Sequence, residues 1–263
     1  MAESLTGMLV HEEPGAGPQP GPAPAAVTAF VGRALRGPLN HPVTLHSFAD
    51  YQQVFGGLWQ PSTLSYAVEQ FFDSGGGAAI VVRVANGARP CSLDLPAGRH
   101  QLRLEALQPG TREFLRAAVD YDGIGDNEVD RFNLVLQRVR APASEHIEDQ
   151  EIYRRLSVDP QSSRHVTAAL AASQIARVAG PVPPLRPDVV RSRVRGGLAG
   201  YVLSNPDGDD GGPLTDYDII GSAAAGTGLF ALAAADSFNF LCVPPPGRDT
   251  DLGPSALLVA HRY

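Results

Sequence analysis

The sequence predicts a mixed α/β (α+β) fold in which a β-rich module separates two stretches of α/β character. Apolar runs without alternation lie at 26–32 and 78–84, and two segments with helical spacing lie between them. Between 88 and 205, short segments alternate polar and apolar residues, which is typical of half-buried strands. From 206 onward, helical and strand-like segments alternate again.

The amino-acid composition indicates a globular protein and excludes several chemistries. The 263 residues are 43% hydrophobic, and 28 acidic side chains against 21 basic ones give a net charge of −7. Every one of these basic residues is an arginine, which excludes a lysine-containing phosphate loop and Schiff-base catalysis. The acidic balance predicts no nucleic-acid partner.

The N-terminus and the apolar runs predict no secretion and no membrane insertion. The first arginine is Arg33, so a signal peptide's positive start is missing, and no apolar run reaches the roughly 18 residues of a membrane span. We therefore expect synthesis in a reducing cytoplasm, where Cys91 and Cys242 do not form a disulfide.

Residues 1–25 are predicted to form a flexible N-terminal arm, because their many glycines and prolines prevent a helix or a central strand. A strand-like patch precedes the prolines; it consists of Met8, Leu9, Val10, His11 and Glu12. A short strand on a tether suits addition to the sheet edge of another subunit, and the alternative is a frayed terminus.

The segment 26–87 is predicted to run strand, helix, helix, strand. In the first helix, Ser47 is the N-cap with Asp50 three residues later, and Gly56 ends the helix. The second helix has apolar residues at i, i+3, i+4, i+7 and i+8, namely Leu64, Ala67, Val68, Phe71 and Phe72. The glycines 75–77 end it before the second strand.

The β-rich module at 88–205 and the last segment at 206–263 complete the predicted organisation. Strands are expected at 101–107, 114–121 and 131–139, with a helix at about 162–172. The last segment has predicted elements at 216–220, 228–232 and 238–243, and a helix that starts at Pro254. Since that helix has nothing after it to pack against, we expect the fold to be incomplete at its C-terminus.

No catalytic, metal or cofactor site is predicted. The acidic loop 207–212 lacks a ligand at the fifth position of a calcium loop, so a solvated turn is favoured over a calcium site. The glycines 75–77 precede a strand, whereas phosphate loops precede a helix. The seven histidines show no metal-ligand spacing.

Several segments, in order along the chain, resemble contractile phage tail sheath proteins. The most specific block comprises VTAFVGRALRGP at 27–38, SFADYQQVFGG at 47–57, LSYAVEQFF at 64–72 and IVVRV at 80–84. Weaker similarity continues with LSVDP at 156–160, LTDYDIIG at 214–221, GLFAL at 228–232 and FNFLCVPP at 238–245. The motif residues are Phe30, Gly32, Arg33, Gly37, Pro38, Phe48, Tyr51, Phe55, Gly56, Phe71, Phe72 and Arg83.

The resemblance implies a discontinuous core domain of strand-helix-helix-strand type. Its first half would be 26–87 and its second half 206–263, apparently incomplete at the C-terminus, with an inserted β-rich domain at 88–205 and the arm at 1–25. The arm is less aromatic and less rich in valine than is usual in the family. The family's chains continue beyond the helix at Pro254, so this chain would be a fragment or a short variant.

The resemblance also implies a function. The chain would be a structural subunit, not an enzyme, that stacks as hexameric rings around an inner tail tube and contracts by rigid-body rearrangement, driving the tube through a target envelope without a cofactor. Its partners would be its own copies, the tube protein, and baseplate and terminator proteins, within a virion tail or injection particle. The alternatives are a sheath-related baseplate or terminator accessory protein, and an α/β enzyme without a recognisable motif.

Overall fold

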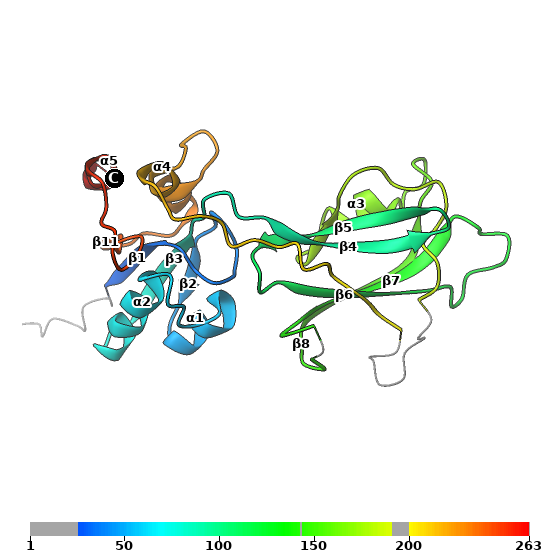
Figure 1. Ribbon diagram of the computed structural model, residues 1–263, viewed down its shortest axis with the longest axis horizontal. Helices are drawn as coiled ribbons and strands as arrows, with labels where there is room; N and C mark the ends of the chain where they lie inside the picture. Colours follow the sequence, from blue (N-terminus) through cyan, green and yellow to red (C-terminus); the bar gives the residue numbers. More distant parts are fainter. Residues whose placement is uncertain (1–25, 143, 191–199, 263) are drawn as a thin grey trace, which may run out of the picture.

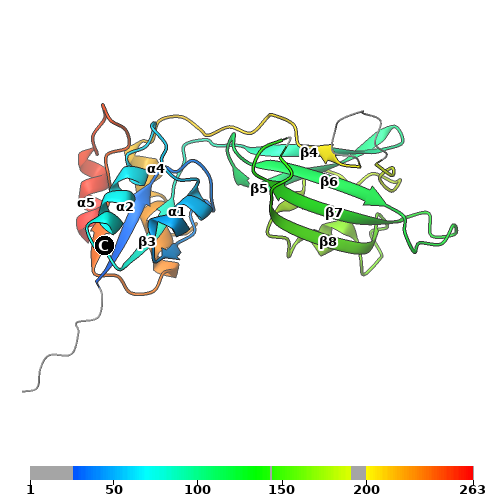
Figure 2. The ribbon, with the colours of Figure 1, turned by 90° about the horizontal axis from the view of Figure 1, so that it is seen from below.

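The computed structural model describes residues 26–142, 144–190 and 200–262, and these residues form two lobes joined by a narrow neck (Figures 1 and 2). We call residues 26–83 and 214–262 the α/β lobe and residues 90–204 the β lobe. The predicted mixed α/β class is confirmed. The predicted arm, with Met8 to Glu12, lies outside the described residues.

A four-stranded sheet forms the centre of the α/β lobe. Its strands, in spatial order, are β11 (Phe240–Cys242), β1 (Val27–Gly32), β3 (Ala78–Arg83) and β2 (Val43–Leu45). β1 runs parallel to both β11 and β3, while β2 runs antiparallel to β3. Strands from the beginning and the end of the chain therefore share one sheet.

Helices cover both faces of this sheet, which explains why its central strands are apolar without alternation. Phe30 of β1 packs in a cluster with α1 (Phe48–Phe55) and α2 (Leu64–Asp73). Its neighbours Ala29 and Val31 belong to a second cluster on the opposite face. That face is covered by α4 (Asp216–Ile220), the 3-10 helix η1 (Gly228–Ala234) and α5 (Pro254–Arg262).

The predicted ends of helix α1 are confirmed. The Ser47 hydroxyl accepts a hydrogen bond from the Asp50 backbone N–H at 3.1 Å, which satisfies one of the free donors of the first turn. Gly56 ends the helix in a left-handed conformation (φ 89°), which glycine adopts without steric cost.

The helix that starts at Pro254 is also confirmed, as α5, and it packs against α4. The Asp216 carboxylate on α4 accepts hydrogen bonds from the backbone N–H groups of Gly253 at 2.8 Å and Ala256 at 3.1 Å. Asp216 thus caps the N-terminus of a helix that lies about 40 residues further along the chain.

The β lobe consists of two antiparallel sheets with a hydrophobic core between them. One sheet contains β10 (Val202–Leu203), β6 (Phe114–Asp120), β7 (Arg131–Val139) and β8 (Ile147–Ser157) in that order. The other contains β4 (Pro90–Ala97), β5 (His100–Pro109) and β9 (Ala176–Val178). The predicted helix at 162–172 is shorter, since α3 covers only Val166–Leu170.

The sequence patterns do not predict strands β2, β4, β8, β9 and β10. β2 has three residues and lies between β1 and α1, in a stretch for which no element was predicted. β8 carries alternating exposed and half-buried residues with many charges. Its place at the edge of its sheet explains this composition, because charged side chains are tolerated there.

Candidate functional site: the junction between the lobes

The lobes are joined by a neck in which two passages of the chain, 84–89 and 205–213, run side by side. Arg89 and Asp209 exchange backbone hydrogen bonds at 2.9 and 2.8 Å. The Gly212 N–H donates to the Asn86 carbonyl at 2.9 Å. The neck is therefore a short antiparallel ribbon of two strand-like passages.

Arg83 anchors the base of the neck from the carboxyl end of β3. Its side chain is buried, with only 1% of the residue exposed. Nη1 donates to the Gly37 carbonyl at 2.7 Å, and Nη2 donates to the Pro109 carbonyl at 2.9 Å. One guanidinium thus connects β3, the loop after β1 and the end of β5.

Burial lowers the pKa of Arg83 to about 10, while the Glu113 and Asp210 carboxylates oppose this change. The guanidinium is therefore still charged at neutral pH. A buried cation that hydrogen-bonds carbonyl groups fixes their directions, because the guanidinium is planar and its donors have a rigid geometry.

Arg33 performs a similar task from the end of β1. Since β1 and β3 are parallel, their carboxyl ends lie at the same edge of the sheet. Arg33 Nη2 donates to the carbonyls of Gly211 at 2.5 Å and Asp210 at 3.1 Å, and its guanidinium lies 4.7 Å from the centre of the Trp59 ring. Asp210 in turn accepts from the Thr111 N–H at 2.7 Å and its hydroxyl at 2.8 Å, which extends the connection into the β lobe.

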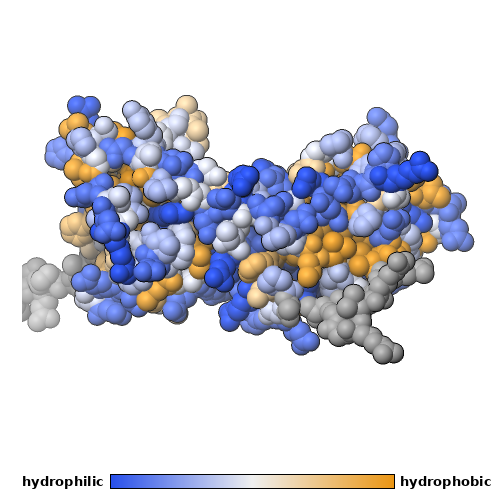
Figure 3. All heavy atoms as spheres, in the orientation of Figure 1, coloured by the Kyte–Doolittle hydropathy of each residue, from blue (hydrophilic) through white to orange (hydrophobic). Residues whose placement is uncertain are grey.

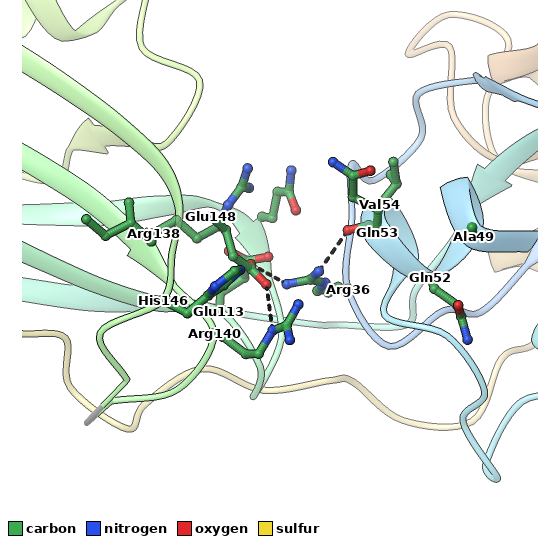
Figure 4. A pocket seen from close by; sticks show the side chains of 12 residues that line it. Arg36, Ala49, Gln52, Gln53, Val54, Glu113, Arg138, Arg140, His146 and Glu148 are labelled. Carbon is green, nitrogen blue, oxygen red and sulfur yellow. Dashed lines mark hydrogen bonds and ion pairs between the residues drawn. The ribbon is translucent and has the colours of Figure 1, made fainter.

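A cleft of about 580 Å³ lies beside the neck, between α1 and the β lobe (Figure 4). Arg36 crosses it from the α/β lobe. Its Nη1 donates to Oε2 of Glu148, on β8, at 2.5 Å, and its Nη2 donates to the Gln53 carbonyl at 2.7 Å. Glu148 also faces Arg140, whose Nε lies 3.6 Å from Oε1.

Glu113 lines the same cleft and is 4% exposed. Within the described residues, its Oε1 has no hydrogen-bond partner. Burial raises the pKa of Glu113, and the cations of Arg138, Arg36 and Arg83 oppose this effect. The Glu113 carboxylate therefore destabilises the native state when it is ionised.

The structure places the predicted motif residues in two groups. The aromatic residues form one layer, since all six belong to the same hydrophobic cluster: Phe30, Phe48, Tyr51, Phe55, Phe71 and Phe72. Within it, ring centres lie 5.2–5.6 Å apart in two sets, Phe30–Phe71–Phe72 and Phe48–Tyr51–Phe55. Arg33, Arg83 and Gly37 meet at the junction, and Pro38 follows Gly37. Gly32 lies at the end of β1, where an added Cβ would be 3.2 Å from Leu64, and Gly56 ends α1.

Sequence reasoning did not single out Arg36, Glu113, Glu148 or Asp210. Arg36 lies within the sheath-like block at 27–38, so that block was a signal for it. Nothing in the sequence indicates that Glu148 is its partner, since the two residues are 112 positions apart.

The acidic loop 207–212 is part of the neck, and two of its carboxylates accept hydrogen bonds there. Asp207 accepts from the Ser92 N–H at 2.8 Å and its hydroxyl at 2.5 Å, and Asp209 accepts from the Gly211 N–H at 2.7 Å. In the described part of the chain, no three His, Cys, Asp or Glu side chains are grouped so that they could hold a metal ion.

The cysteines and the helices of the described residues bear on disulfides and membrane spans. Cys91, which is buried, and Cys242, which is partly buried, are both free thiols. Among residues 26–142, 144–190 and 200–262, no helix has the length and apolar character needed to cross a bilayer.

Comparison with known proteins gave matches only among solved structures. No protein-family model and no curated protein matches the chain. The chain is similar to a sheath tail protein of Listeria innocua, with a TM-score of 0.48, 13% identity, and coverage of 84% of this chain and 40% of that chain. It is also similar to a sheath tail protein of Desulfitobacterium hafniense, with a TM-score of 0.46, 15% identity, and coverage of 92% of this chain and 46% of that chain. The chain spans less than half the length of both proteins.

Proposed function

We propose that the chain is a structural subunit of a contractile tail sheath, which stacks as hexameric rings around an inner tube and contracts by rigid-body rearrangement. The observation that carries this proposal is the ordered series of sheath-like segments from 27–38 to 238–245. The side chains of its most specific block serve packing and the lobe junction. Residues with these tasks suit a protein that transmits force between packed bodies.

The domain organisation proposed for this role is a discontinuous core domain, made of 26–87 and 206–263, with 88–205 inserted. Support comes from the sheet in which β11, near the end of the chain, lies beside β1. The two chain passages of the neck are where such an insertion would leave and return.

The proposed contact between subunits is strand addition by the N-terminal arm. β11 is an edge strand of three residues, and Phe240 on it is 62% exposed. Among the described residues, no strand pairs with its outer edge. An edge with free backbone groups can accept a strand such as Met8 to Glu12 from another copy. The other proposed partners are the inner tube, baseplate and terminator proteins, in a virion tail or injection particle.

Co-expression with the inner tube protein, followed by electron microscopy, tests this function. We expect striated sheathed tubes with the wild-type chain and bare tubes with Val10→Pro, because proline removes a backbone donor from the predicted strand. Ala16→Pro is the matched control, since it lies in a stretch that is already rich in proline and glycine, and it should assemble normally.

Two other results would contradict the proposal. Bare tubes with the wild-type chain would argue against a sheath subunit, and isolated rings without long tubes would favour the accessory protein. Assembly by the Val10→Pro variant would leave the sheath role intact but exclude strand addition by the patch.

A further inference from the structure

Across the cleft the lobes are joined by an ion pair, while the apolar side chains that line it, Ala49, Val54 and Ile147, leave it open. The cleft remains open, with a volume of about 580 Å³, and its walls include Gln52, Gln53 and Gln108. On the face shown in Figure 3, hydrophilic residues cover much of the neck, and apolar surface is concentrated on the two lobes. Domains without a large apolar interface move relative to one another unless a specific contact holds them.

Arg36 supplies such a contact. In the described residues, Arg36–Glu148 is the only ion pair that joins the α/β lobe to the β lobe. Their side chains are only 16% and 14% exposed, so solvent screens the pair weakly. A short hydrogen bond between two charged groups is also stronger than a neutral one.

Both charges keep a partner if this contact opens. Arg140 and Glu148 lie in the same lobe, so the 3.6 Å approach between them does not depend on the lobe angle. Arg36 and Gln53 lie together in the other lobe, joined by the 2.7 Å hydrogen bond to the Gln53 carbonyl. Opening therefore leaves neither charge without a compensating group, which makes the contact reversible.

We propose that the neck is a hinge and that Arg36 is the clasp that fixes its angle by binding Glu148 across the cleft. Arg83 and Arg33 fix the point at which the lobes meet at the neck. The neck itself pairs only two passages of the chain, and the clasp restricts rotation of the lobes about this point. This inference concerns the isolated chain and does not depend on the sheath role.

Distances between spin labels on the two lobes test the clasp. One label replaces exposed Gln70 on α2 (Gln70→Cys) and the other replaces exposed Thr167 on α3 (Thr167→Cys), in a full-length chain with Cys91→Ala and Cys242→Ala. We expect a narrow distance distribution, and a shifted and broader one after Arg36→Gln. Arg140→Gln is the matched control, because it removes a cation from the same carboxylate without crossing the cleft, and its distribution should stay narrow.

Each other outcome overturns the proposal. Equal distributions for the background chain and Arg36→Gln, whether narrow or broad, mean that Arg36 does not set the angle. If Arg36→Gln and Arg140→Gln broaden the distance distribution equally, the loss of any positive charge near Glu148 has the same effect, and Arg36 is not a specific clasp. Circular dichroism confirms folding of each variant. If Arg36→Gln does not fold, Glu148→Gln takes its place, and an unchanged distribution for this variant refutes the clasp.

Discussion

The substitution Arg83→Lys tests whether the geometry of the buried guanidinium, beyond its charge, holds the junction together. Arg83 donates to the carbonyls of Gly37 and Pro109 from two different nitrogens. The lysine ammonium carries all its donors on one nitrogen, so it cannot reproduce the two hydrogen bonds that Arg83 makes from two nitrogens. We expect at least one of the two carbonyls to lose its donor in the buried site. An unsatisfied buried acceptor costs about 1–3 kcal/mol. The ammonium is also more strongly hydrated than the guanidinium, so its burial costs more.

We therefore expect Arg83→Lys to lower the free energy of unfolding by about 2–4 kcal/mol. The fall of the Arg83 pKa to about 10 corresponds to a charge-burial cost of about 3 kcal/mol. Arg83→Met removes this cost but leaves both carbonyls without a donor, at about 1–3 kcal/mol each. Because the two effects roughly offset one another, its loss of stability should not exceed that of Arg83→Lys. Such an order, with the apolar substitution tolerated at least as well as the charged one, is not expected at an exposed site.

Urea unfolding followed by circular dichroism measures these differences, and hydrogen exchange of the backbone amides locates them. Exchange should become faster near 37–40 and 109–111. Arg177→Lys is the matched control, because Arg177 pairs with Glu105 at the surface with its side chain 61% exposed, and exposed ion pairs contribute less than about 1 kcal/mol. A loss for Arg83→Lys no larger than for Arg177→Lys, with unchanged exchange, would refute the reasoning.

Two further predictions concern Glu113 and Gly37. Burial raises the pKa of Glu113 in the native state, so the unfolded chain releases this proton at a lower pH. The native state therefore loses stability as the pH rises above the pKa that Glu113 has in the unfolded chain. Glu113→Gln should unfold with the same free energy as wild type near pH 4 and with a higher one near pH 8; a lower one would mean that the arginines need the carboxylate. Gly37 has a φ of 102°, and a Cβ there would lie 2.6 Å from the Phe55 ring, whereas at Gly75 (φ 89°) it would meet nothing within 4 Å. Gly75→Ala should therefore cost only the roughly 1–2 kcal/mol of left-handed backbone, and Gly37→Ala clearly more in the same urea assay; equal losses would show that Phe55 moves aside freely.

The α/β lobe could be predicted best where local and tertiary requirements agree. β1 and β3 are apolar on both sides because helices cover both faces of their sheet. Helix α1 has a capping serine and a left-handed glycine at its ends. In each case, a few residues that are neighbours in the sequence are sufficient to predict the strand or helix.

Elements and contacts that depend on distant partners could not be predicted in this way. β8 has the composition of a loop, and only pairing with β7 makes it a strand. The clasp joins Arg36 to a carboxylate in another lobe, and the neck pairs 84–89 with 205–213. Arg83 shows the same limit, because its place after an apolar run does not reveal that its charge is buried.

Buried Arg83 and partly buried Arg33 also bear on how a sheath-like block of sequence should be interpreted. An apolar side chain at position 83 could fill the space without the cost of burying a charge, and buried ion pairs are often replaced by apolar residues without loss of stability. Apolar packing, however, does not fix the direction of a carbonyl, whereas Arg83 fixes two and Arg33 reaches two more in the neck. We therefore infer that these arginines orient the neck, and that the aromatic layer stabilises the α/β lobe, from which the neck emerges. In the proposed hinge, these two arginines would fix the point about which the lobes turn, and the contact between Arg36 and Glu148 would fix the angle.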